Sequence, residues 1–236
     1  MTNILMSVPA FHTGWAYPAL APYIHPGMKA AIAALSYGEG WISDIDEWRM
    51  CYGKGQREYE EIVQPFLACG LREKDIAWIN YVEDTPLSAA KKILDSDILF
   101  LTGGYPDWML QRMYDLEIKN LIRDYEGVVI GVSAGAMVQL DLYHLTPEDG
   151  YEYQYQEGLG MLGGFDVEVH YEEDLRHIEA IIRTLEDTGR AVVAMDNQSG
   201  LLIDGDHLEL LGNAFILDMN DLDELYQTYD GLRFAY

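Results

Sequence analysis

The sequence predicts an α/β fold, a three-layer sandwich in which a mostly parallel central sheet is covered by helices on both faces. Short apolar runs with strand character alternate with amphipathic helical patterns along the chain. Such alternation requires crossover connections that place helices on the faces of a parallel sheet. The 236 residues, 49% of them hydrophobic, suffice for a single α/β domain with a sizeable core over residues 1–236.

The expected strands are short runs of apolar residues bounded by turn residues. They cover residues 3–8, 29–35, 75–81, 98–102, 128–132, 165–169 and 191–195, and residues 201–211 contain a hairpin turn at Asp204-Gly205. Ligands bind such sheets beyond the carboxyl ends of the strands. The residues after Thr102, Val132 and Val169 are therefore candidates for a site.

Helices are expected between these strands. They cover residues 56–68, 85–94, 118–124, 134–142 and 174–187, with one more starting near Pro106 and another in the acidic, aromatic tail after residue 220. Thr85-Pro86 is typical of an N-cap followed by proline in the first turn. Gly70 and Gly189 are typical of helix C-termini.

Composition excludes several classes of protein. Forty acidic residues against fifteen basic ones give a net charge of -25, which disfavours nucleic acid and anionic membranes as partners. No apolar stretch reaches the 18 residues of a membrane-spanning helix, and the N-terminus lacks the features of a signal peptide. Cys51 and Cys69 make neither a disulfide framework nor a CxxC motif, so we expect a cytoplasmic protein.

No cofactor or metal is expected. The acidic run Glu172-Glu173-Asp174 is interpreted as a solvated loop that caps a helix, because nothing else in the sequence completes a set of metal ligands. The expected partner is a small peptide substrate. A second copy of the chain, in a homodimer, is a further candidate partner.

Ser133 is the strongest nucleophile candidate. It follows the strand at 128–132, and Ala134-Gly135-Ala136 opens the next helix, which is the strand-turn-helix setting of a GxSxG serine. Small residues, Gly131 and Gly135 above all, let the sharp turn form without collisions. The Ala134 amide at the helix N-terminus can hold a developing oxyanion.

A second glycine turn, Gly103-Gly104, follows the strand at 98–102. Glycines at a strand end let the backbone approach a ligand closely, so the amide of Gly104 or of Tyr105 is a candidate for the second oxyanion donor. The alternative is an ordinary turn in which Pro106 starts a helix.

A serine hydroxyl needs a base. His170 directly follows the strand at 165–169, which delivers it to the active edge, and His177 is the alternative. The group that orients the imidazole stays open. Its candidates are Asp196, Asn197 and Asp204, and the helix after Asp174 could also bring Glu172 or Glu173 near.

Three segments resemble a known family. They are 98–104 (ILFLTGG), 131–136 (GVSAGA) and 158–162 (GLGML) leading to 167–170 (VEVH). In this order they are similar to the S51 serine peptidases, the group of peptidase E (aspartyl dipeptidase) and cyanophycinase. The resemblance implies the class I glutamine amidotransferase-like fold, a flavodoxin-like α/β sandwich.

The resemblance also implies roles for residues. Ser133 would be the nucleophile, His170 the base, and the amides of Gly104 and Ala134 the oxyanion hole. The third member of the family's triad is a glutamate after the next strand. This chain has Asn197 there, with Asp196 beside it.

Two further positions concern the substrate. Where peptidase E has an arginine for an N-terminal aspartate, only Arg176 is available here, in an acidic stretch. The family's Gly-Gly-Asn-Thr run is Gly104-Tyr105-Pro106, so Tyr105 is a second substrate-binding candidate.

These observations favour a serine peptidase that hydrolyses short peptides through an acyl-enzyme, as an exopeptidase or dipeptidase. Two alternatives stay open. One is a binding or regulatory protein on an inactive hydrolase fold, and the other is an esterase or amidase with a non-peptide substrate.

Overall fold

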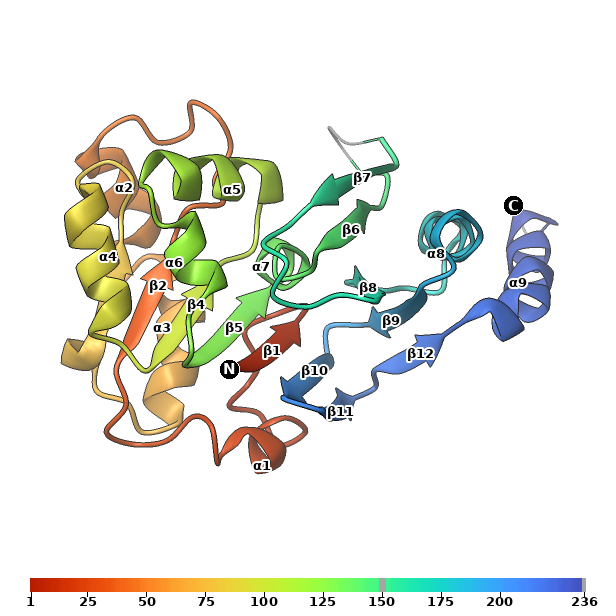
Figure 1. Ribbon diagram of the computed structural model, residues 1–236, viewed down its shortest axis with the longest axis horizontal. Coiled ribbons are helices and arrows are strands. Elements are labelled where there is room, and N and C mark those ends of the chain that lie inside the picture. The colour runs from red at the N-terminus through yellow and green to blue at the C-terminus, as the bar shows by residue number, and fades with distance from the viewer. Residues whose placement is uncertain (149–151, 235–236) are drawn as a thin grey trace.

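The computed structural model describes residues 1–148 and 152–234 (Figure 1). Its main element is a seven-stranded sheet with the order β11-β10-β1-β5-β4-β2-β3. The strands are β1 (Thr2–Met6), β2 (Ala30–Ala33), β3 (Ile76–Ile79), β4 (Ile98–Leu101), β5 (Val128–Val132), β10 (Ser199–Asp204) and β11 (His207–Gly212). β1 to β5 run parallel, and the β10–β11 hairpin joins β1 antiparallel. The predicted mostly parallel sheet is confirmed.

Side chains alternate between the two faces of this sheet, as the pleat requires. In β4, Leu99 and Leu101 pack into one core, whereas Ile98 and Phe100 pack into the other. The first core is covered by α4 (Pro86–Leu94), α5 (Pro106–Asp115), α6 (Lys119–Arg123) and α7 (Ala134–Met137). The second is covered by α1 (Tyr17–Leu20), α2 (Ile45–Tyr52) and α3 (Arg57–Ala68). The three-layer prediction is therefore confirmed, although α1 and α2 were not anticipated.

A second sheet has three strands, in the order β12-β9-β8. It contains β8 (Phe165–Val169), β9 (Ala191–Met195) and β12 (Phe215–Leu217), packed with α8 (Leu175–Thr188) and α9 (Leu222–Phe234). The expectation that the strand ending at Val169 belongs to the central sheet is wrong. The edge of β1 that faces away from β5 is taken by β10, so β8 and β9 pair with each other instead.

The helix expected over 134–142 is also wrong, because α7 ends at Met137. The GLGML segment (158–162) packs against residues 138–141 and takes up their backbone hydrogen bonds. The amides of Gly158, Leu159 and Gly160 donate to the carbonyls of Asp141, Val138 and Leu140, which therefore cannot continue a helix. Residues 142–145 and 154–157 instead form the hairpin strands β6 (Leu142–Leu145) and β7 (Gln154–Glu157).

The described residues also form two short 3₁₀ turns, η1 (Glu73–Asp75) and η2 (Met219–Asp221). The tail is helical as predicted, in α9. Within the described part of the chain, no helix is both long enough and apolar enough to cross a membrane.

Replacing Phe100 by alanine tests the second core. Phe100 is 1% exposed, and its ring lies 5.6 Å from the ring of Phe66. We expect Phe100→Ala to lower the free energy of unfolding by about 3–5 kcal/mol, since it leaves a cavity in a packed core. Urea denaturation measures this. Leu87→Ala is the control, because Leu87 is 81% exposed, and equal losses in the two variants would contradict the assignment.

Candidate active site

Ser133 occupies a sharp turn between β5 and α7. Its backbone has φ 52° and ψ −116°, a conformation that residues with a side chain rarely adopt. The Ser133 amide donates to the Met6 carbonyl at 2.8 Å, which fixes the turn against the end of β1. Gly131 and Gly135 allow this turn, because a Cβ atom on Gly131 would lie 2.0 Å from the Gly135 carbonyl oxygen.

The second glycine turn lies against Ser133. A Cβ atom built on Gly103 would be 3.3 Å from the Cβ atom of Ser133. The Tyr105 amide is occupied, because it donates to the Ser36 carbonyl at 2.7 Å. Within the described residues the amides of Gly104 and Ala134 donate to no acceptor, so these two remain the candidates for oxyanion donors.

Ser36, which the sequence did not single out, supports this turn. Its hydroxyl donates to the Gly103 carbonyl and lies 2.7 Å from the Thr102 hydroxyl. Gly104 has φ 132°, and a Cβ atom there would lie 2.4 Å from the Ser36 carbonyl oxygen. Glycine is therefore required at position 104 both by conformation and by space.

Arg112 in turn supports the segment that carries Ser36. Its buried guanidinium donates to the Leu35 carbonyl at 2.6 Å and to the Tyr37 carbonyl at 2.5 Å, and it stacks 3.7 Å from the centre of the Tyr37 ring. Burial lowers the pKa of Arg112. Arg112 therefore stabilises a segment about 75 positions away in the chain, which no local sequence pattern predicts.

His170 follows β8 and also has a positive φ, 55°. Its amide donates to the Ser7 hydroxyl at 3.0 Å, and that hydroxyl donates to the Met195 carbonyl at 2.8 Å. Nδ1 of His170 lies 2.8 Å from Oδ1 of Asn197. Because an amide oxygen only accepts, Nδ1 carries the proton in this contact and Nε2 of the neutral ring has the free lone pair.

The other candidates for the orienting group lie elsewhere. Asp196 accepts hydrogen bonds from the Ser199 hydroxyl and the Asn213 side chain, and so closes its own loop. Asp204 accepts from the Thr2 hydroxyl, at the end of β1 opposite to Met6. Glu172 and Glu173 are exposed. Among these candidates, only Asn197 has a hydrogen bond to the His170 ring within the described residues.

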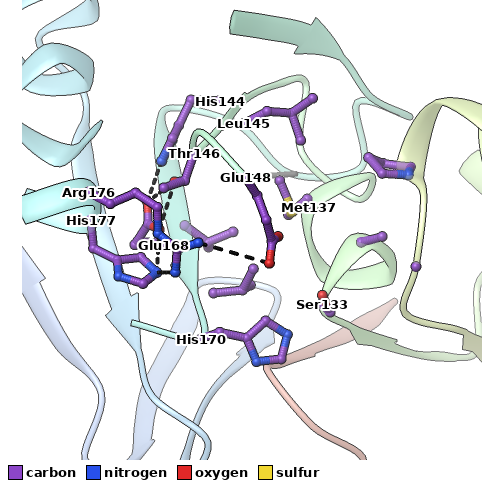
Figure 2. Close-up of a pocket in the computed structure, with 15 residues that line it drawn as sticks. Ser133, Met137, His144, Leu145, Thr146, Glu148, Glu168, His170, Arg176 and His177 are labelled. Atoms are coloured by element: carbon purple, nitrogen blue, oxygen red, sulfur yellow. Dashed lines mark hydrogen bonds and ion pairs between the residues drawn. The ribbon is translucent and has the colours of Figure 1, made fainter. Parts of the chain in front are cut away.

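A cavity of about 150 Å³ brings the predicted site residues together (Figure 2). Ser133, His170, Gly104, Ala134 and Arg176 all line it. A second cavity of about 250 Å³ also reaches Ser133, His170 and Gly104 from the side of α3. No hydrogen bond joins Ser133 to His170 in the described part of the chain, although Figure 2 shows both side chains at the same edge of the first cavity.

The two substrate-binding candidates take different places. Arg176 lies on the cavity wall, with one guanidinium nitrogen 3.9 Å from Glu148 and another 3.3 Å from Nε2 of His177. Tyr105 lies beside Gly104, where its ring meets the ring of Trp41 edge to face with centres 5.4 Å apart. His177, the alternative base, is buried and bonds Asp174 through Nδ1.

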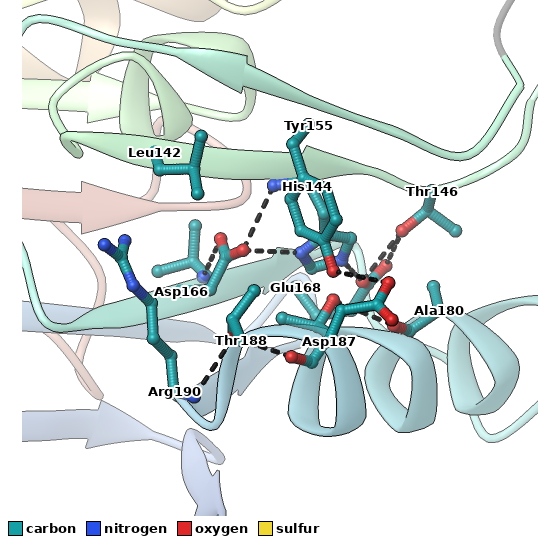
Figure 3. Close-up of polar contacts among 12 residues, drawn as sticks. Leu142, His144, Thr146, Tyr155, Asp166, Glu168, Ala180, Asp187, Thr188 and Arg190 are labelled. Carbon is teal, nitrogen blue, oxygen red and sulfur yellow. Dashed lines mark hydrogen bonds and ion pairs between the residues drawn. The ribbon is translucent and has the colours of Figure 1, made fainter.

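A buried ionic cluster that sequence reasoning missed forms part of the cavity wall (Figure 3). His144, 1% exposed, contacts Asp166 through Nδ1 at 2.9 Å and Glu168 through Nε2 at 2.5 Å. Carboxylates only accept, so both ring nitrogens donate and His144 is an imidazolium. Burial alone would lower the pKa of His144, but the charges of Asp166 and Glu168 and their hydrogen bonds raise it to about 10.

Among the described residues, no group of three or more His, Cys, Asp or Glu side chains is arranged to hold a metal ion.

Comparison with known proteins gives a family and a fold. The model of peptidase family S51 matches residues 55–211. No curated protein matches the chain. A structure from Listeria monocytogenes EGD-e, described as a candidate peptidase E, superposes with a TM-score of 0.63 and 13% identity over 89% of this chain and 96% of its own. A peptidase from an acI-B1 Actinobacterium superposes with a TM-score of 0.57 and 15% identity, over 92% of this chain and 93% of its own.

The pH dependence of stability tests the His144 cluster. A pKa raised from 6.5 to about 10 on folding adds stability that is complete below pH 6.5 and is lost as the pH rises toward 10. We expect the free energy of unfolding to fall over this range by up to about 1.4 kcal/mol per pH unit. His144→Gln should lack this component in parallel denaturant titrations. A neutral His144 ring at pH 8, seen by nitrogen NMR, would refute the imidazolium.

Proposed function

This chain belongs to peptidase family S51, and from that premise we propose that it hydrolyses short peptides as a serine exopeptidase or dipeptidase. One observation carries the proposal. Ser133, held in a strained turn, shares a cavity with His170, whose Nδ1 contacts Asn197 at 2.8 Å. A nucleophile, a base and an orienting group are the parts that acyl transfer requires.

In the proposed mechanism, the Ser133 hydroxyl attacks the carbonyl carbon of the scissile bond while Nε2 of His170 takes its proton. The amides of Gly104 and Ala134 bind the oxyanion of the tetrahedral intermediate. His170 then gives the proton to the leaving amine, which departs and leaves an acyl-serine. Water, deprotonated by His170, attacks the acyl-serine, and the proton returns to Ser133 as the peptide fragment is released.

Asn197 would serve as the third member of the triad. Its amide oxygen keeps the proton on Nδ1 of His170, so that Nε2 can act as the base. A neutral amide stabilises the imidazolium less than a carboxylate does, but Cys-His-Asn enzymes work with the same arrangement.

The two cavities that meet at Ser133 support a short substrate. The first, of about 150 Å³, and the second, of about 250 Å³, are both lined by Ser133 and His170. We assign the first residue of the peptide to the cavity with Arg176, and the segment around Tyr105 to its rim. The cytoplasm is the proposed location, and the free cysteines Cys51 and Cys69 are compatible with its reducing conditions.

Cleavage of a mixed dipeptide and tripeptide library, followed by mass spectrometry, tests the nucleophile. We expect wild-type protein to cleave a subset of the peptides and Ser133→Ala to lose this activity by at least a thousandfold, because no other group can form the acyl-enzyme. Equal cleavage by both proteins would refute the mechanism. If neither protein cleaves any peptide, while Ser133-dependent hydrolysis of esters occurs, the esterase alternative replaces the peptidase.

Substitution of Asn197 tests the orienting group. Asn197→Ala should lower kcat about a hundredfold, because the His170 ring loses its fixed tautomer and orientation. Asn197→Glu restores the family's carboxylate and should keep or raise kcat. Gln198→Ala is the control, since Gln198 is the next exposed residue of the same loop. The assignment fails if kcat is the same in Asn197→Ala and in the control.

A further inference from the structure

One wall of the cavity beside Ser133 is strongly charged. β8 presents alternate side chains on one face, so Asp166 and Glu168 point to the same side of the strand. Glu168 lines the cavity, whereas Asp166 lies behind it. Both carboxylates are 2% exposed. The catalytic steps above use neither of them.

Glu168 is held rigidly as an anion. Oε2 accepts from Nε2 of His144 at 2.5 Å, and the Thr146 hydroxyl donates to Oε1 at 2.7 Å. Its remaining neighbour across the cavity is Nε2 of His177, 3.6 Å from Oε1. That contact is longer than a hydrogen bond. Nε2 of His177 instead lies 3.3 Å from a guanidinium nitrogen of Arg176, which can only donate, and Nδ1 of His177 lies 3.0 Å from Oδ1 of Asp174.

The wall therefore carries more negative than positive charge. Four carboxylates lie on or directly behind it, and they belong to Glu148, Asp166, Glu168 and Asp174. Among the described residues, the cations beside them are the His144 imidazolium and the Arg176 guanidinium. Asp166 and Glu168 are buried and share His144, whereas the side chains of Glu148 and Asp174 are 75% and 42% exposed. Two buried carboxylates with one shared cation are costly, and a ligand that supplies a second cation recovers part of that cost.

We propose that this wall binds an ammonium group on the first residue of the substrate, with Glu168 as the specificity-determining carboxylate. The inference rests on the proposed peptidase function, because it assigns the first residue to this cavity. The ammonium group has two sources, the α-amine of the peptide and a side-chain amine.

An acidic first residue fits this wall poorly. Among the described residues that line the cavity, Arg176 is the cation that an acidic side chain would meet, and Arg176 already faces Glu148 at 3.9 Å. The Glu148 side chain is 75% exposed, so it is free to turn toward an incoming cation. A carboxylate ligand would instead approach the fixed anion of Glu168, and like charges in a desolvated pocket repel strongly. The site thus selects for positive charge.

Binding to the Ser133→Ala protein tests this without catalysis. Isothermal titration calorimetry compares ornithyl-leucine with norleucyl-leucine, which has a methyl group in place of the side-chain ammonium. It also compares norleucyl-leucine with its N-acetyl form, and aspartyl-leucine with asparaginyl-leucine. We expect at least a tenfold gain in affinity from one of the two ammonium groups and weaker binding of the aspartyl peptide.

Glu168→Gln in the same Ser133→Ala background assigns the effect to Glu168. It should abolish the gain from the ammonium group while keeping the size of the side chain. Asp166→Asn is the matched control, because it removes the other carboxylate from His144 but not from the cavity, and it should retain the gain. Thermal unfolding shows whether each variant is folded. If a variant does not fold, the peptide series on the Ser133→Ala protein, which keeps Glu168 and Asp166, still tests the ammonium site.

The outcomes separate this inference from the proposed function. Tighter binding of aspartyl-leucine, or equal binding of charged and neutral peptides, overturns the ammonium site even if wild-type protein cleaves peptides. A gain from the ammonium group that survives Glu168→Gln overturns the role of Glu168. Selective binding that depends on Glu168, without cleavage by wild-type protein, would keep the ammonium site and refute the peptidase.

Discussion

The end of strand β1 holds the two halves of the candidate site together. The Met6 carbonyl accepts from the Ser133 amide, and the Ser7 hydroxyl accepts from the His170 amide while donating to the Met195 carbonyl. Ser133 belongs to the seven-stranded sheet and His170 to the three-stranded one. Met6 and Ser7 thus set the positions of the nucleophile and the base where the two sheets meet. Ser133 and His170 both have positive φ angles. Such conformations persist only where surrounding contacts enforce them.

The oxyanion side depends on a parallel arrangement at the end of β2. Arg112 fixes the carbonyls on either side of Ser36, and Ser36 fixes the turn at Gly103 and Gly104. The buried guanidinium is compensated by the Leu35 and Tyr37 carbonyl oxygens and by the face of the Tyr37 ring. The site residues therefore follow the ends of β4, β5, β8 and β9. Contacts at the end of β1 support the nucleophile and the base, and contacts at the end of β2 support the oxyanion side.

The sequence predicts what is encoded locally. The strand, the turn and the helix start around Ser133 are consecutive, and the strand before His170 alternates apolar residues with Asp166 and Glu168. Whether Asp196 or Asn197 faces the imidazole depends on the rotation of one loop, which the Ser199 and Asn213 contacts of Asp196 decide. Ser7 could not be found, because it contacts residues more than 160 positions away. The early end of α7 likewise depends on amides that come from the distant GLGML segment.

The strand order limits how far the protein can be truncated from its N-terminus. The region that matches the family begins at residue 55, after both β1 and β2. Among the described strands, β1 lies between β10 and β5 and pairs with both, and β2 lies between β4 and β3 and pairs with both. A truncated protein that starts at residue 55 would have its sheet broken at two internal positions, and would expose unpaired strand edges that invite aggregation. A shortened protein that keeps the whole sheet must therefore start no later than Thr2, more than 50 residues before the region that matches the family model.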